Sequence, residues 1–251
     1  MTTKPVIVFA GGAWHLPEHF QEIRDELHMR GYETQGVAYQ SVGAEPPTKG
    51  MFDDAAAVRT VLEELADQGR EIVLVVHSYG GLVGAEAVKG LGYKQRAKEN
   101  KVGGVALLLY MAAFVAPKGQ CILSLTGDVF PSWTKVEDGR IFVLDPDEAF
   151  YEDVSAVAKE RAIGLLKHQT VVSFEERVTY EPWHDIDCMY FGCEDDKAIP
   201  FFAQEQMQAL LGPTAIKLNK KTSHSPFLSA VSETADVIET AANTGHVAIG
   251  A

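Results

Sequence analysis

A serine, a carboxylate and a histidine, which together can perform nucleophilic catalysis, occur in this chain in that order. They are Ser78, Asp196 and His224. A serine hydroxyl is a weak nucleophile near neutral pH unless a histidine accepts its proton, and the histidine needs a carboxylate to orient it. The three residues predict an acyl-transfer site in which Ser78 attacks a carbonyl carbon.

The residues around Ser78 predict a tight turn between a strand and a helix. An apolar run at 72–76 precedes the serine, and an amphipathic segment at 82–88 follows it. Such a turn, called a nucleophile elbow, holds the hydroxyl clear of the sheet. Gly80 and Gly81 allow the helix to pass close to the strand, because they carry no Cβ.

The position of His224 fits that of a catalytic base, since it follows the last predicted strand and precedes the last predicted helix. The acid is less well defined, because several acidic residues follow the strand predicted at 188–191. Asp196 is favoured by its place in Asp-Lys-Ala-Ile-Pro, where Pro200 begins the next helix. Asp195 stays open as the alternative.

Two backbone amides are expected to stabilise the negative charge that forms on the carbonyl oxygen. One is the N–H of Tyr79, directly after the nucleophile. The other should come from the loop at 11–15, Gly-Gly-Ala-Trp-His, in which Ala13 is the predicted donor. We therefore predict an oxyanion hole made by Ala13 and Tyr79.

Several aromatic residues are candidates for lining an acyl or aryl pocket, although each could equally be part of the core or the cap. They are Trp14, Phe114, Phe130, Trp133 and Phe227. His15 and His19 are four residues apart, a spacing that binds zinc on a helix. Pro17 lies between them and no third ligand is apparent, so we predict no metal site and no cofactor.

Apolar runs alternate with helical patterns along most of the chain. This order predicts an α/β fold with a doubly wound, mainly parallel sheet covered by helices on both faces. The segment at 116–183 shows helical stretches, notably 149–168, but no clear buried strand. We therefore expect residues 1–115 and 184–251 to form the core and 116–183 a helical cap.

Composition limits the partners of the protein. The 251 residues include 22 basic and 35 acidic side chains, which give a net charge of −13 and argue against nucleic-acid binding. Three cysteines without paired spacing favour a reducing compartment. No apolar run approaches the length of a membrane span, and no signal peptide is recognisable. We expect a cytoplasmic protein, monomeric or homodimeric.

The motifs resemble those of the α/β-hydrolase superfamily, in the branch that contains plant methylesterases, hydroxynitrile lyases and small fungal hydrolases. The resemblance covers nearly the whole chain and is strongest to fungal members, several of which act in natural-product pathways. It rests on the segments at 11–15, 39–43, 77–81, 103–105, 196–200 and 223–227. Val76 departs from the pattern, which usually has glycine there, and so does Ala10, where relatives often have His or Pro.

The resemblance implies a cofactor-free serine esterase that acts on a small or medium ester or a lactone. Ser225 occupies the place where plant hydroxynitrile lyases carry a lysine, which disfavours cyanohydrin cleavage. Two alternatives remain. The same site could serve as a general base for C–C cleavage, elimination or cyclisation, or the fold could be a ligand receptor without turnover.

Overall fold

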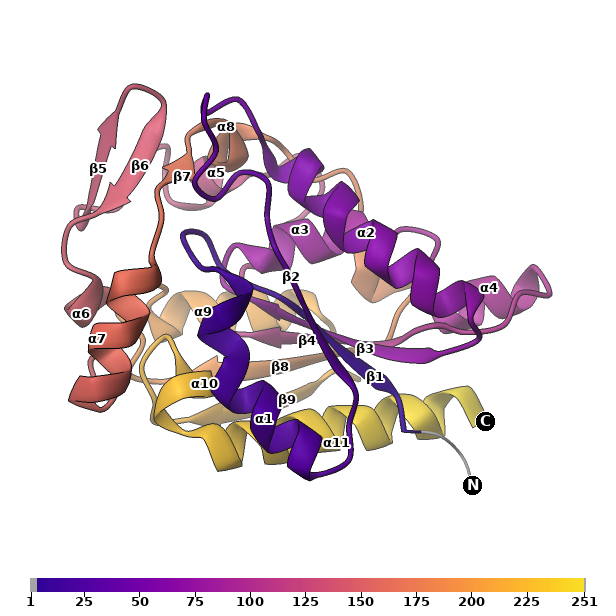
Figure 1. The fold of residues 1–251 in the computed structure, drawn as a ribbon. Helices are drawn as coiled ribbons and strands as arrows, with labels where there is room; N and C mark the ends of the chain where they lie inside the picture. The colour runs from indigo at the N-terminus through magenta and orange to yellow at the C-terminus, as the bar shows by residue number, and fades with distance from the viewer. Residues whose placement is uncertain (1–3, 251) are drawn as a thin grey trace.

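Six parallel strands form the central sheet of the computed structural model, which describes residues 4–250 and their side chains as far as His246 (Figure 1). The strand order is β2-β1-β3-β4-β8-β9, and every neighbouring pair is parallel. The strands are β1 (Val6–Ala10), β2 (Thr34–Val37), β3 (Glu71–His77), β4 (Gly104–Met111), β8 (Cys188–Cys193) and β9 (Ile216–Lys220). The predicted parallel sheet is confirmed.

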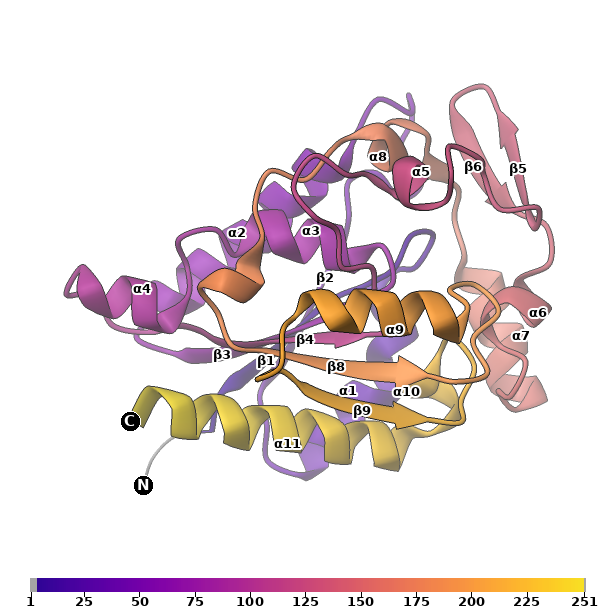
Figure 2. The same cartoon turned by 180° about the vertical axis from the view of Figure 1, so that it is seen from behind.

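Helices cover both faces of this sheet (Figures 1 and 2). One face carries α2 (Met51–Asp67), α3 (Gly80–Ala87) and α9 (Phe201–Leu210), and α4 (Tyr93–Lys98) precedes β4. The other face carries α1 (Gln21–Met29), α10 (Pro226–Ser229) and α11 (Val231–Gly250). None of the helices within residues 4–250 is both long and apolar enough to cross a membrane.

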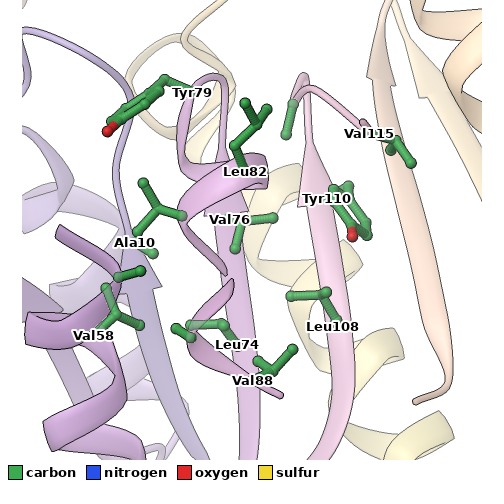
Figure 3. Packing of buried hydrophobic residues seen from close by; sticks show 14 of the residues in the cluster. Ala10, Val58, Leu74, Val76, Tyr79, Leu82, Val88, Leu108, Tyr110 and Val115 are labelled. Atoms are coloured by element: carbon green, nitrogen blue, oxygen red, sulfur yellow. The ribbon is translucent and has the colours of Figure 1, made fainter. Parts of the chain in front are cut away.

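Strand β3 lies in the middle of the core, which explains its uninterrupted apolar sequence. A strand buried on both faces needs apolar side chains at every position rather than at alternate ones. Leu74 and Val76 pack beneath Leu82 of α3 on one face (Figure 3). Val73 and Val75 belong to the cluster on the opposite face. The strand that leads to Ser78 is therefore held rigidly from both sides.

The segment between β4 and β8, residues 112–187, is called the insertion below. Most of it lies at the carboxyl ends of the strands, and its last residues return beside α4 to the start of β8 (Figure 2). Its helical elements are α5 (Ile122–Leu125), α6 (Pro146–Phe150), α7 (Ala156–Leu165), α8 (Val172–Glu175) and the 3-10 turn Pro182–His184. It also holds an antiparallel sheet of β5 (Thr134–Glu137), β6 (Arg140–Val143) and β7 (Gln169–Thr170).

The cap predicted as helical at 116–183 therefore also contains three short strands. Strands β5 and β6 are joined at Asp138 and Gly139, which both adopt positive φ, 49° and 74°. An Asp-Gly pair with positive φ at both residues is the turn typical of a two-residue hairpin. That dipeptide was the available signal, but the two strands are short and largely exposed, so no buried run accompanies it.

Two predicted helices are interrupted. The helical pattern at 149–168 divides into α6 and α7, and the side chain of Ser155 caps α7 by accepting a hydrogen bond from the amide of Ala158. The final helix breaks at Ala230 into α10 and α11. Residues 17–20 form a 3-10 turn directly before α1.

Candidate active site

Ser78 occupies a tight turn between β3 and α3, as the sequence predicts. Its φ is 55°, a left-handed conformation that residues other than glycine rarely adopt. A Cβ on Gly80 would lie 2.4 Å from the carbonyl oxygen of Ala10, and one on Gly81 would lie 1.9 Å from that of Phe114. Both glycines are required because α3 starts against the ends of two neighbouring strands.

Asp196 and His224 form a buried pair at the ends of β8 and β9. Nδ1 of His224 lies 2.7 Å from Oδ2 of Asp196, and both side chains are almost fully excluded from solvent. The carboxylate also accepts hydrogen bonds from the amides of Ala198 and Ile199 and from the side chain of Gln204. An ionised carboxylate can only accept, so Nδ1 of His224 carries the proton and Nε2 is left as the basic nitrogen.

Of the two candidate acids, Asp195 and Asp196, the side chain of Asp196 contacts His224. Asp195 is exposed, and its amide donates to the carbonyl of Thr222, so its side chain does not pair with His224. Asp196 is the carboxylate that meets the histidine. Ser78 and His224 are not hydrogen-bonded to each other in this structure, although catalytic contacts of this kind commonly tighten only when substrate is bound.

His77, directly before the serine, connects the turn to the histidine loop. Its Nε2 donates to the backbone carbonyl of His224 over 2.9 Å, and the two rings lie 4.6 Å apart. Burial, and then the charge of His224, holds the pKa of His77 well below its ordinary value. A neutral His77 therefore fixes the backbone that carries His224.

A cavity opens beside Ser78 and is walled mainly by aromatic and aliphatic side chains. Its other lining residues are Ala13, Trp14, Tyr79, Phe114, Ile122, Thr126, Pro131, Trp133, Phe150, Phe174, Ala198 and Ile199. Several of them belong to the insertion, which therefore forms much of the cavity wall.

Three of the five predicted pocket residues line this cavity, namely Trp14, Phe114 and Trp133. Phe130 does not line it but stacks on Phe174, which does, with ring centroids 6.3 Å apart. Phe227 was predicted wrongly, because it is buried on the opposite face of the sheet and stacks on Phe20 at 4.3 Å. It lies in the first turn of α10, and its side chain faces the 3-10 turn at residues 17–20.

Ala13 and Tyr79 line the same cavity as Ser78. Neither of their backbone amides donates a hydrogen bond to any acceptor within residues 4–250. The carbonyl of Ala13 accepts from Nδ1 of His15 at 2.7 Å, which fixes the orientation of the loop. Two unpaired amides beside a turn serine are the arrangement expected of an oxyanion hole.

Trp14 fastens this loop to the insertion. Its φ of 67° is unusual for a residue with a side chain. Its amide donates to Oε1 of Gln169 at 3.2 Å, its indole N–H donates to the carbonyl of Ile141 at 2.9 Å, and its carbonyl accepts from the amide of Lys167 at 3.2 Å. The loop beside Ser78 is thus held by residues that lie far away in the sequence.

His15 and His19 use their ring nitrogens within the protein. His15 bonds the carbonyl of Ala13 and the hydroxyl of Tyr151, and His19 bonds the backbone of Leu16 and the carbonyl of Ala162. Burial is the main reason that the pKa of each histidine lies below its ordinary value. In the part of the chain that the structure describes, no three histidine, cysteine or acidic side chains converge as metal ligands.

Several contributors to the site were missed by reasoning from the sequence. Phe150 and Phe174 line the cavity, yet in the sequence they are only apolar positions in a segment of unknown orientation. Gln169, which binds the amide of Trp14, carries no sequence signal at all.

A family model described as "Alpha/beta hydrolase family" matches residues 7–237. The chain belongs to the alpha/beta hydrolase family. This alpha/beta hydrolase is 34% identical to the alpha/beta hydrolase nvfD of Aspergillus novofumigatus over 235 residues, which is 90% of this chain and 92% of the relative. Both findings indicate an enzyme of the hydrolase type and agree with the predicted resemblance to fungal hydrolases.

Solved structures show the same fold. A pyrethroid hydrolase from Sphingobium faniae matches with a TM-score of 0.76 and 21% identity, over 95% of this chain and 97% of the other. A methylesterase from Arabidopsis matches with a TM-score of 0.75 and 15% identity, over 95% and 99% of the two chains. At such identities, the likeness of the alpha/beta hydrolase to these proteins establishes the fold.

Proposed function

We propose that this alpha/beta hydrolase cleaves an uncharged carboxylic ester or lactone through an acyl-enzyme on Ser78. The proposal rests on two observations: Ser78, Ala13 and Tyr79 line one cavity, and the amides of Ala13 and Tyr79 have no acceptor within residues 4–250. An amide pair of this kind stabilises the oxyanion that forms when a serine attacks a carbonyl group. That the structural neighbours include a methylesterase supports the choice of an ester.

The mechanism follows from the order of contacts. Nε2 of His224 takes the proton of Ser78 as its oxygen bonds to the carbonyl carbon, and Asp196 stabilises the imidazolium through Nδ1. The amides of Ala13 and Tyr79 bind the oxyanion. His224 then protonates the departing alcohol, and a water molecule activated by the same nitrogen releases the acid and restores Ser78.

The cavity wall favours a neutral substrate. None of its lining side chains carries a charge at neutral pH, since burial keeps the pKa of its one phenol, Tyr79, well above the ordinary value. A substrate carboxylate buried there would lose its hydration without gaining a cation. Ring faces from Trp14, Trp133 and Phe150 instead suit an aryl, polycyclic or branched alkyl group.

The test is the hydrolysis of aryl esters of increasing acyl length by the wild-type protein and by Ser78→Ala. Loss of hydrolysis in the variant would support Ser78 as the nucleophile, and the preferred length would size the cavity. Asp196→Asn should lower kcat by about 10³–10⁴-fold, because His224 would lose its orienting acceptor. Asp195→Asn is the matched control and should stay within about twofold, as its side chain is exposed.

Two outcomes would contradict the proposal. Hydrolysis that survives in Ser78→Ala would exclude the assigned nucleophile. Folded wild-type protein that neither hydrolyses any ester of the series nor forms an acyl-enzyme would favour the alternatives from the sequence. These are general-base C–C cleavage, elimination or cyclisation, and then ligand binding without turnover.

A further inference from the structure

A continuous row of buried polar side chains connects the two segments that supply the unpaired amides. It begins at Trp14, whose amide donates to Oε1 of Gln169. Nε2 of Gln169 donates to Oγ of Ser41 at 2.6 Å, and that hydroxyl donates to Oδ2 of Asp54 at 2.5 Å. The same carboxylate oxygen accepts from the phenol of Tyr79 at 2.8 Å. We call Gln169, Ser41 and Asp54 the polar bridge.

The polar bridge is fully buried and its hydrogen bonds are satisfied. Its three side chains have no solvent exposure. Gln169 uses its second N–H on Oγ of Ser173 at 2.6 Å, and Oδ1 of Asp54 accepts from the amide of Ser41 at 2.9 Å. Buried polar groups without partners are strongly destabilising, whereas a complete network is rigid and fixes one arrangement. The bridge therefore holds its two ends at a defined separation.

Both ends of the bridge lie next to a proposed oxyanion donor. One end binds the amide of Trp14, the residue after Ala13, and the other binds the side chain of Tyr79, whose own amide is the second donor. The phenol leaves the turn on the side of α2, which carries Asp54 (Figure 3). Trp14 and Ser78 both have positive φ, a conformation that persists only where tertiary contacts impose it.

We propose that Gln169, Ser41 and Asp54 are positioning residues that set the distance and direction between the Ala13 and Tyr79 amides. The inference rests on the proposed function, since it concerns the oxyanion hole of that site. Oxyanion donors act only when they lie within hydrogen-bond distance of the position the oxygen reaches in the transition state. Without the bridge the amides would remain, but their geometry would loosen, so substrate binding would change less than the chemical step.

The chain offers a matched pair of variants for the test. Tyr79→Phe removes the phenol that closes the bridge and keeps the backbone amide. Tyr39→Phe removes an equally buried phenol that has no hydrogen-bond partner, from a ring 5.8 Å away in edge-to-face contact with Tyr79. Both phenols lie within the electrostatic reach of Asp54, and only that of Tyr79 donates a hydrogen bond to it.

The measurement is the second-order rate at which an aryl fluorophosphonate labels Ser78, followed by intact mass spectrometry. This probe needs the activated serine and the oxyanion hole but not the natural substrate. Tyr79→Phe should label about tenfold more slowly than wild type, and Tyr39→Phe within about twofold of it. On any ester that the wild type hydrolyses, Tyr79→Phe should lower kcat and leave KM nearly unchanged.

Failure of the bridge and failure of the proposed function give different results. If Tyr79→Phe is labelled as fast as the wild type, only the bridge proposal is overturned. The same holds if Tyr39→Phe loses as much of the labelling rate as Tyr79→Phe does. Folded wild-type protein that is not labelled overturns the proposed function, and the inference falls with it.

A second pair of measurements tests the far end of the bridge. Gln169 and Tyr79 belong to one network, so their substitutions should not act independently. The double variant Gln169→Leu/Tyr79→Phe should be labelled only slightly more slowly than the slower of the two single variants. Multiplicative effects would contradict a shared bridge. Should Gln169→Leu fail to fold, the Tyr79 and Tyr39 comparison still decides the question.

Discussion

Asp54→Asn should change how the stability of the protein depends on pH. Asp54 is fully buried, and burial raises its pKa from 3.8 to about 6, against the opposing effect of hydrogen bonds from Ser41 and Tyr79. The folded protein therefore retains the Asp54 proton to a higher pH than the unfolded chain does. A pKa raised by folding contributes stability at low pH, and this contribution disappears as the pH rises through about 6.

The size of the effect follows from the two pKa values. The full contribution of Asp54 is about 3 kcal/mol, of which about 2 kcal/mol disappears between about pH 4.5 and 7.5. The difference in free energy of unfolding between wild type and Asp54→Asn should fall by that amount over this interval. His15 and His77, whose pKa values are lowered by burial, act in the opposite direction, but they are present in both proteins and cancel in the difference.

Urea unfolding at four pH values between about 4.5 and 7.5 measures this difference. Asp53→Asn is the neighbouring control, because the hydrogen bond from Lys49 lowers the pKa of Asp53 and removes its titration from the interval. The free energy of unfolding of Asp53→Asn should depend on pH in the same way as that of the wild type. A raised pKa of Asp54 is excluded if the stability of Asp54→Asn depends on pH as that of the wild type does, or if the difference in free energy of unfolding grows with pH.

The remaining predictions concern close backbone approaches around the turn, and both are measured by urea unfolding. Gly81→Ala should lower the free energy of unfolding by more than about 3 kcal/mol, because its Cβ would overlap the carbonyl of Phe114. A Cβ on Gly164 in α7 meets nothing within 4 Å, so Gly164→Ala should raise the free energy of unfolding by about 0.5–1 kcal/mol. A Cβ on Gly84 would lie 2.4 Å from Cγ1 of Val76, so Gly84→Ala should lower the free energy of unfolding by about 1–3 kcal/mol. Adding Val76→Ala to this variant should recover at least about 1 kcal/mol of that loss. A loss in Gly164→Ala, or additive effects of the two substitutions at 76 and 84, would contradict these explanations.

The Val76 and Gly84 contact also explains a departure from the family pattern. Val76 replaces the usual glycine at the end of β3, and its side chain occupies the space beneath Gly84 of α3. The close approach of strand and helix behind Ser78 is therefore kept, although the motif in the sequence is incomplete.

The fold could be predicted where the sequence carries a local pattern. Buried parallel strands are continuous apolar runs, so β1, β3, β4 and β8 were identifiable without a partner. The insertion was predicted less well. Its β5–β6 hairpin is largely exposed, with Ile141 as the buried residue of β6. The break between α6 and α7 falls where Tyr151 lies in the core against His15. Neither feature leaves a periodic pattern.

Local patterns in the sequence were enough to place the candidate nucleophile and base. A strand, a serine and paired glycines define the turn at Ser78, and the histidine after the last strand can reach it because parallel strands end at one edge of the sheet. Each of these signals is local, since it depends on backbone conformation within a few residues. Chain order alone was therefore enough to bring Ser78 and His224 to the same edge.

Selection among equivalent residues and the environment of the site depend on the folded arrangement of the chain. Asp195 and Asp196 are adjacent, and only the path of the loop turns one of them towards His224. Gln169 reaches the amide of Trp14 across 155 positions of sequence. Burial, hydrogen-bond partners and cavity walls are properties of segments that meet only after folding, so no local pattern of residues records them.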